Sequence, residues 1–121
     1  MYKHLIDIVS PHYQDLLAHC EKNKIAINLD FQDLTISIND DNRKKIDAFL
    51  QTEIRRALKI CKAGDKITLA ETNDNQAIKI SVKNSGAETL SPAEKAELIA
   101  KGYEVRARFG YDTIVTLKLV R

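Results

Sequence analysis

The chain has 121 residues, of which 44% are hydrophobic and 30% charged, so we expect one soluble globular domain over residues 1–121. A chain of this size can bury a core without metal or disulfide support. The formal net charge of +2 argues against nucleic acid as a partner, and no stretch approaches the about 20 apolar residues of a membrane span.

The first residues, Met1 to His4, lack the apolar run of a signal peptide. We therefore expect a cytoplasmic domain without direct membrane insertion. Whether it belongs to a longer, membrane-attached chain stays open. Cys20 and Cys61 fall on the apolar sides of predicted helices, so we expect buried free thiols in a reducing compartment rather than a disulfide. Neither has the spacing of a metal ligand.

The N-terminal third predicts one helix and two strands. Ser10 and Pro11 are a helix-start signal, because serine caps free amides and proline suits the first helical position. A polar turn over residues 21–24 ends this helix. Residues 25–31 and 34–38 each alternate apolar with polar or small side chains, which predicts two strands that pair as a β-hairpin.

A long central helix follows the capping residues 39–42 and stops at Gly64-Asp65. Its predicted apolar face is Ile46, Phe49, Leu50, Ile54, Ala57, Leu58 and Cys61. Its predicted solvent side is basic and carries Lys44, Lys45, Arg55, Arg56, Lys59 and Lys62. A solvated face is the simplest interpretation of these charges, and a docking surface for an acidic partner is the alternative.

The second half predicts two strand pairs with a helix between them. Ile67 and Leu69, and then residues 78–82, alternate as half-buried strands. Ser91-Pro92, with Glu94, starts a helix that Gly102 ends. Two final strands contain Val105, Ala107 and Phe109, and Val115, Leu117 and Leu119, around a turn at residues 110–112. This order predicts a two-layer α/β sandwich: a mixed, mostly antiparallel sheet with about three helices on one face.

Three motifs in this order resemble the ATP-binding domain of histidine kinases, in the wider GHKL family that includes gyrase B and MutL. Ala57-Leu58-Lys59, with the strand from Gly64 to Leu69, resembles the end of that family's central helix and its next strand. The run from Ile80 to Gly86 resembles Ile-x-Val-x-Asp-Asn-Gly. The segments 101–105 and 110–119 resemble the closing hairpin. The resemblance spans roughly residues 5–121 and implies the same fold.

The residues that the resemblance places at the nucleotide are mostly altered. Arg56 stands where the family has a magnesium-holding Asn, and a guanidinium repels a metal although it can still meet a phosphate. Four residues earlier, Thr52 replaces a polar Asn or Glu, with Glu53 out of register by one. The adenine-reading Asp is Asn84, which accepts hydrogen bonds without the charge. The second glycine of that motif is Glu88.

Only residues 87–91 separate this loop from the next helix, so the family's lid and second glycine box are missing. The resemblance therefore implies a degenerate nucleotide site with no catalytic residue, no metal and no cofactor. Its positions are Thr52, Arg56, Lys59, Asn84 and Gly86. No histidine fits a phosphoacceptor, because neither His4 nor His12 is followed by an acidic residue, and the histidines form no metal-ligand set.

The resemblance implies a signal-transduction domain that binds or scaffolds a protein, such as a response-regulator receiver domain, and performs no chemistry. The ATPase-like half of some histidine phosphotransferases is similar, and a homodimer would then form through an upstream helical region. One alternative is a minimal kinase domain that still binds ATP weakly, with Arg56 in place of the metal. A second alternative is an unrelated α/β module with the same order of elements.

Overall fold

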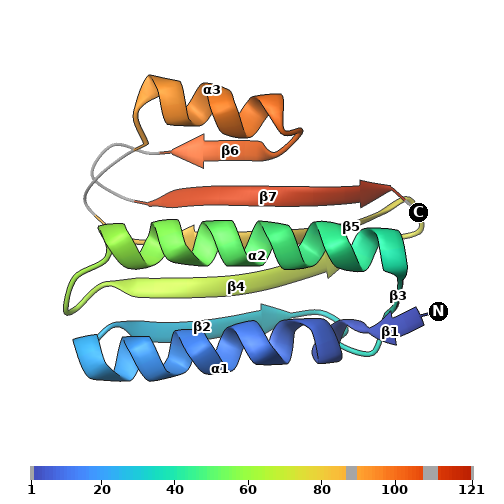
Figure 1. Cartoon of the computed structure of the whole chain (residues 1–121), viewed down its shortest axis with the longest axis horizontal. Helices are drawn as coiled ribbons and strands as arrows, with labels where there is room; N and C mark the ends of the chain where they lie inside the picture. Colours follow the sequence, from blue (N-terminus) through green and yellow to red (C-terminus); the bar gives the residue numbers. More distant parts are fainter. Residues whose placement is uncertain (1, 87–89, 108–111, 121) are drawn as a thin grey trace.

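A mixed sheet with helices on one face forms the molecule (Figure 1). The structure is a computed structural model and describes residues 2–86, 90–107 and 112–120. In this part of the chain, a five-stranded sheet has the order β2-β4-β5-β7-β6, and only β2 and β4 pair in parallel. Its strands are β2 (Ala26–Phe31), β4 (Lys66–Asn73), β5 (Ala77–Asn84), β6 (Glu104–Ala107) and β7 (Thr113–Val120). The helices are α1 (Leu5–Asn23), α2 (Asp40–Ile60) and α3 (Pro92–Ala100). The predicted two-layer sandwich is confirmed.

The first helix begins earlier than predicted, at Leu5 instead of Ser10. A short strand, β1 (Tyr2–His4), precedes it and pairs with β3 (Ser37–Asn39). The N–H groups of Leu5 and Ile6 donate to the carbonyls of Ile36 and Leu34, each at 2.9 Å. Tertiary acceptors thus replace the serine cap, and Pro11 lies inside the helix.

The predicted hairpin of residues 25–31 with 34–38 is wrong. β2 pairs in parallel with β4, and β3 pairs with β1 in a separate two-stranded sheet. After β2 the chain is bonded to β4, because Gln32 N–H donates to the Glu71 carbonyl and Asp33 N–H donates to Glu71 Oε1 at 2.8 Å. The chain then crosses over through α2, as parallel strands require.

The core lies between the helices and the sheet, with α2 at its centre. α2 begins at the predicted cap, where the Asn39 side chain accepts from Asn42 N–H at 2.8 Å. Phe49 is fully buried and meets Tyr103 edge to face at a centroid distance of 5.0 Å. The other buried α2 residues are Ile46, Leu50, Glu53, Ile54 and Ala57, while the predicted Leu58 is half-buried. No helix of the described residues is long and apolar enough to span a bilayer.

The C-terminal elements are close to the prediction. α3 begins with the predicted capping box of Ser91 and Glu94. Gly102 has a φ of +88°, a left-handed conformation that ends the helix and turns the chain into β6. β6 pairs with Thr113–Thr116 of β7, so in the described residues no strand pairs with the outer side of residues 117–120. The predicted Phe109 and most of the turn at residues 110–112 lie outside the described residues.

The bonds of Glu71 generate a prediction about stability. This buried carboxylate accepts from Asp33 N–H and, at 2.6 Å, from the Asn73 side chain. Glu71→Ala leaves both donors without their acceptor and opens a cavity, so we expect a loss of about 2–4 kcal/mol in urea unfolding. Glu71→Gln keeps an acceptor and should cost less. The exposed control Glu21→Ala should change little, and equal costs for Glu71→Ala and Glu21→Ala would contradict the role.

Candidate functional site

The groove between α2 and α3 holds three of the five residues predicted from the sequence. Thr52, Arg56 and Lys59 line a cavity of about 300 Å³ together with Arg55 and with Glu94 of α3. The helical spacing of three and four residues places them on one side of α2. The cavity is mainly cationic, which favours an anion or an acidic surface.

Arg56 was predicted on the solvent side of α2, and this is wrong: its side chain is only 17% exposed. Its Nη1 atom lies 3.7 Å from Oε1 of Glu53, which is 2% exposed. Neither atom has a hydrogen-bond partner in the described residues. The distance is that of a long, buried ion pair. The attraction at this distance does not fully compensate the free-energy cost of removing both charges from water. Arg56 therefore pairs with a buried carboxylate and also lines the cavity.

The environment of Glu53 favours its neutral form. Burial raises the pKa of the Glu53 carboxyl, while the cations of Arg56 and Lys101 oppose that rise. Burial also raises the pKa of the Tyr103 phenol, and the nearby Glu53 carboxylate adds to this effect. These side chains come from α2 and from the segment between α3 and β6. Glu53 and Arg56 are largely shielded from solvent, whereas Lys101 is exposed.

The other two predicted residues, Asn84 and Gly86, do not line this cavity. Asn84 is 5% exposed, and its Oδ1 atom accepts from the N–H of Gly86 at 3.1 Å. At least one of the two lone pairs of this carbonyl is thus engaged within its own turn. A Cβ at Gly86 would clash with Cγ2 of Ile60 and lie 3.2 Å from both the Ile60 carbonyl and Asn84 Oδ1. The end of α2 therefore packs directly on this loop.

Both cysteines are buried and free, as predicted. Burial, assisted by the Asp65 carboxylate, raises the pKa of the Cys61 thiol to about 11, although backbone N–H groups of Gly86 and Ser85 act in the opposite direction. Burial also raises the pKa of the Cys20 thiol. Both side chains are therefore protonated at neutral pH and unsuited to nucleophilic chemistry.

Two of the three histidines, His4 and His12, have side-chain partners. His12 Nε2 lies 3.0 Å from Oδ1 of Asp47, and Arg43 Nη1 donates to Oδ2 of the same carboxylate at 3.3 Å. This contact joins α1 to α2. His4 lies 2.8 Å from the carbonyl of Thr35 through Nδ1. In the described residues, no group of three or more His, Cys, Asp or Glu side chains is placed to hold a metal ion.

Sequence reasoning missed Arg55 and Glu94 as cavity residues and Glu53 as a buried one. Glu53 was detectable, because it lies three residues after Leu50 and four before Ala57, both on the apolar face. Glu94 was used only as a capping residue, and its position opposite α2 depends on tertiary packing. The prediction for Glu88 lies outside the described residues.

The solved structures that match this chain agree on the fold. The catalytic domain of histidine kinase ThkA, in a nucleotide-free form, aligns with a TM-score of 0.81 over 99% of this chain and 94% of that chain, at 14% identity. The mycobacterial sensor histidine kinase MprB aligns with a TM-score of 0.72 over 99% of this chain and 97% of that chain, at 10% identity. ThkA in complex with the response regulator protein TrrA aligns with a TM-score of 0.80 over 99% of this chain and 41% of that chain, at 14% identity.

No protein-family model and no curated protein matches the sequence. At these identities the structural likeness concerns the fold. The chain therefore has the GHKL-type fold of histidine kinase catalytic domains, as its motifs predicted.

The Glu53–Arg56 pair predicts a pH-dependent stability defect. A carboxyl whose folded pKa is raised contributes stability that is present below its unfolded pKa and is lost as pH rises through the folded pKa. Arg56→Met removes the main opposing cation and raises that folded pKa further. We expect a loss of about 2 kcal/mol in urea unfolding at pH 8 and a smaller loss at pH 5.

Two variants control this measurement. Arg55→Met changes the neighbouring, exposed cation and should show no such pH dependence. Glu53→Gln combined with Arg56→Met should remove the difference between the two pH values. An equal loss at pH 5 and pH 8 for Arg56→Met alone would show that the pair is not electrostatically coupled.

The contact between Gly86 and Ile60 predicts a compensating pair of substitutions. Gly86→Ala should destabilise the protein by about 1–3 kcal/mol, because the added methyl group meets Ile60 Cγ2. In the Ile60→Ala background the same substitution should cost less, because that methyl group is gone. A double-mutant cycle from urea unfolding measures the coupling. Strict additivity would mean that the loop does not rest on Ile60.

Proposed function

We propose that this chain is a signal-transduction domain with a histidine-kinase fold and a degenerate nucleotide site, and that it binds a protein partner and performs no phosphoryl transfer of its own. It would act as a binding or phosphotransfer-supporting module, as the sequence suggests. The fold supports the signalling context, since its structural neighbours are histidine kinase catalytic domains. The arrangement of the altered residues supports the loss of nucleotide chemistry.

The observation that carries the proposal is the position of Arg56. The resemblance places a magnesium-holding Asn there, whereas this chain has a cation 3.7 Å from the buried Glu53. A guanidinium donates hydrogen bonds and ligates no metal. The carbonyl of Asn84 is buried and already accepts a hydrogen bond from Gly86 N–H, which leaves it less available to a ligand. Metal and adenine recognition are thus both weakened, each by a separate feature.

The exposed cations at the cavity support a protein partner. Among the described residues, neither Arg55 nor Lys59 has a carboxylate within ion-pair distance. Both therefore keep their charge available for an acidic surface, where complementary charge increases the association rate. One structural neighbour, ThkA, is seen in complex with the response regulator TrrA. A response-regulator receiver domain is accordingly the partner we propose here.

The alternative function is weak nucleotide binding by the same cavity. Thr52, Arg55, Arg56 and Lys59 offer a hydroxyl and three cations to a phosphate chain, without a metal. This alternative predicts that ATP stabilises the fold, since a ligand that binds only the native state raises its stability by RT ln(1 + [L]/Kd).

A thermal-shift titration separates the two functions. We expect ATP at about 1 mM, with and without magnesium, to change the Tm by less than about 1 °C. A saturable increase that Arg55→Glu or Lys59→Glu abolishes would support the nucleotide-binding alternative instead.

Partner binding is tested separately, with receiver domains from the same genome immobilised one at a time. We expect the double variant Arg55→Glu with Lys59→Glu to weaken the complex by about tenfold or more, because it places like charges opposite each other and slows association. The control Lys22→Glu with Lys62→Glu makes the same change in net charge away from the cavity. Equal losses in both double variants, or no binding of any receiver domain, would contradict the proposed partner.

A further inference from the structure

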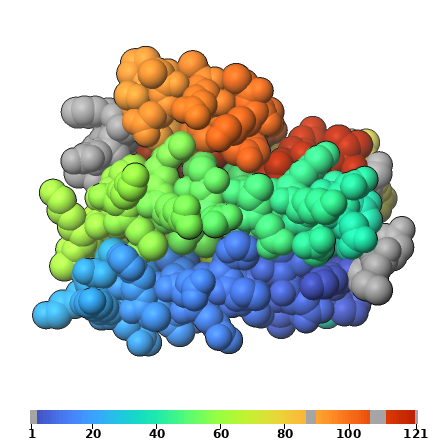
Figure 2. All heavy atoms as spheres, in the orientation of Figure 1, coloured from blue at the N-terminus to red at the C-terminus, as the bar shows by residue number. Residues whose placement is uncertain are grey.

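A second groove lies elsewhere, at the N-terminal half of α2. It has a volume of about 510 Å³ and is bounded by α2, by the turn between α3 and β6, and by the end of β7. Figure 2 shows the surface of β7 reaching the helical side of the molecule beside α3 and the first turns of α2. None of Thr52, Arg56 or Lys59 lines this groove, so it is distinct from the cavity described above.

The groove exists because β6 is shorter than β7. β6 pairs only with Thr113–Thr116, and the chain turns away at Gly102–Tyr103 into α3. On the other side, β5 pairs with β7 as far as Val120. Residues 117–120 thus have a neighbour on one side only, as far as the described residues go. The outer N–H and C=O groups of such an edge can pair with another strand.

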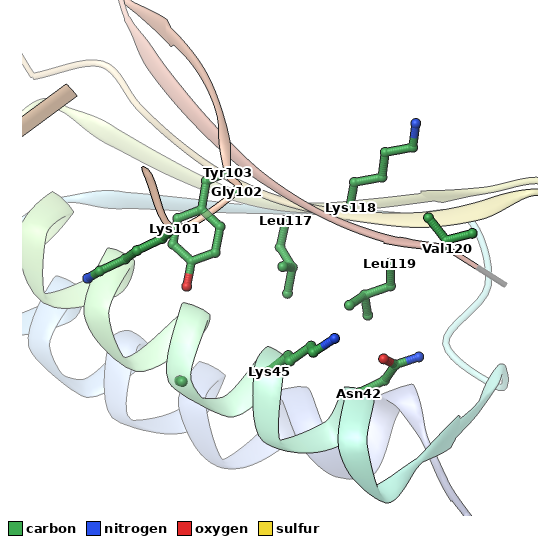
Figure 3. A pocket seen from close by; sticks show the side chains of 10 residues that line it. Asn42, Lys45, Lys101, Gly102, Tyr103, Leu117, Lys118, Leu119 and Val120 are labelled. Carbon is green, nitrogen blue, oxygen red and sulfur yellow. The ribbon is translucent and has the colours of Figure 1, made fainter. Parts of the chain in front are cut away.

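The floor of the groove is apolar. Leu117 and Leu119 point toward α2, while Lys118 and Val120 point to the other face of the sheet (Figure 3). The ring of Tyr103 stands beside Leu117 and closes one end. A strand added in line with β6 would place alternate side chains on this floor, as sheet pleating requires.

The rim of the groove is basic. Lys45 and Lys101 line it, Lys118 extends from the same strand edge on the opposite face of the sheet, and no Asp or Glu is among the lining residues. In Figure 3 the Lys45 side chain extends from α2 into the groove toward Leu119. Lys45 and Lys118 have no ion pair in the described residues, and Lys101 has only an exposed contact of 3.9 Å with Glu97. Exposed pairs of that kind contribute little.

We propose that this groove binds an extended acidic peptide segment, which adds a strand to the free edge of β7 in line with β6. Backbone pairing with residues 117–120 gives the affinity, alternate apolar side chains occupy the floor, and carboxylates meet the lysines. A second copy of this chain fits less well, because pairing two such edges would bring the lysines of both copies together. The proposal does not depend on what the α2–α3 cavity binds.

Peptide selection tests this proposal. A random linear peptide library is displayed, selected on the wild-type protein and counter-selected on the Lys45→Glu variant. We expect sequences with Asp or Glu and an alternating apolar residue. In NMR titrations, a selected peptide should shift the amides of residues 117–120 and Gly102. Selected peptides without acidic bias, or shifts confined to another surface, would overturn the proposal.

Matched variants identify the interactions. Lys45→Glu should weaken the selected peptide by about tenfold, while Lys44→Glu, an exposed lysine on the same helix that does not line the groove, should stay within about twofold. Two peptides are N-methylated at alternate amides, one at the odd and one at the even positions. One of the two should lose binding, because methylation of the amides that face β7 blocks backbone pairing without changing charge. Retained binding of both peptides would overturn strand addition. Self-association of the protein through residues 117–120 in sedimentation would assign the edge to a second copy instead.

Discussion

The packing of α2 across the sheet is the constraint on which the other features depend. Ile46, Phe49 and Leu50 are buried against the sheet and fix the rotation of the helix about its axis. Because side chains repeat every 3.6 residues, that rotation also decides where the polar positions face. Asp47 then meets His12 of α1, Lys45 lies in the groove beside β7, and the C-terminal cations face α3.

Two glutamates are buried, with different consequences. Glu71 on β4 has both carboxylate oxygens bonded, to Asp33 N–H and to the Asn73 side chain, so its burial is compensated and holds the crossover from β2. Glu53 on α2 has only a long contact with Arg56. A buried polar group without hydrogen bonds reduces stability, and such groups persist where another requirement outweighs the cost. The cost therefore falls beside the α2–α3 cavity, which Arg56 lines.

The sequence was informative wherever the signal is local. The 3.6-residue period located α2, the Asn39 cap and the Ser91–Glu94 box located helix starts, and helical spacing brought Thr52, Arg56 and Lys59 together. Alternation shows which face of a strand is buried but does not show which strand lies beside it. From the sequence, β2 was therefore predicted to pair with the wrong strand. Asn84 has a suitable side chain for a ligand, but a local bond to Gly86 N–H decides its orientation, and residue type alone does not show this.

The electrostatic interactions of Glu53 also link the α2–α3 cavity to the groove beside β7. Lys101 and Tyr103 line the groove beside β7. The Lys101 cation lowers the pKa of Glu53, and Glu53 raises the pKa of Tyr103. Arg56, the ion-pair partner of Glu53, lines the cavity at α3. Tyr103 packs edge to face on Phe49, which ties this segment to the core of α2. An acidic segment in the groove would offset the charge of Lys101 and so strengthen the dependence of Glu53 on Arg56. The buried carboxylate is thus electrostatically coupled both to a residue of the α2–α3 cavity and to a residue of the groove beside β7.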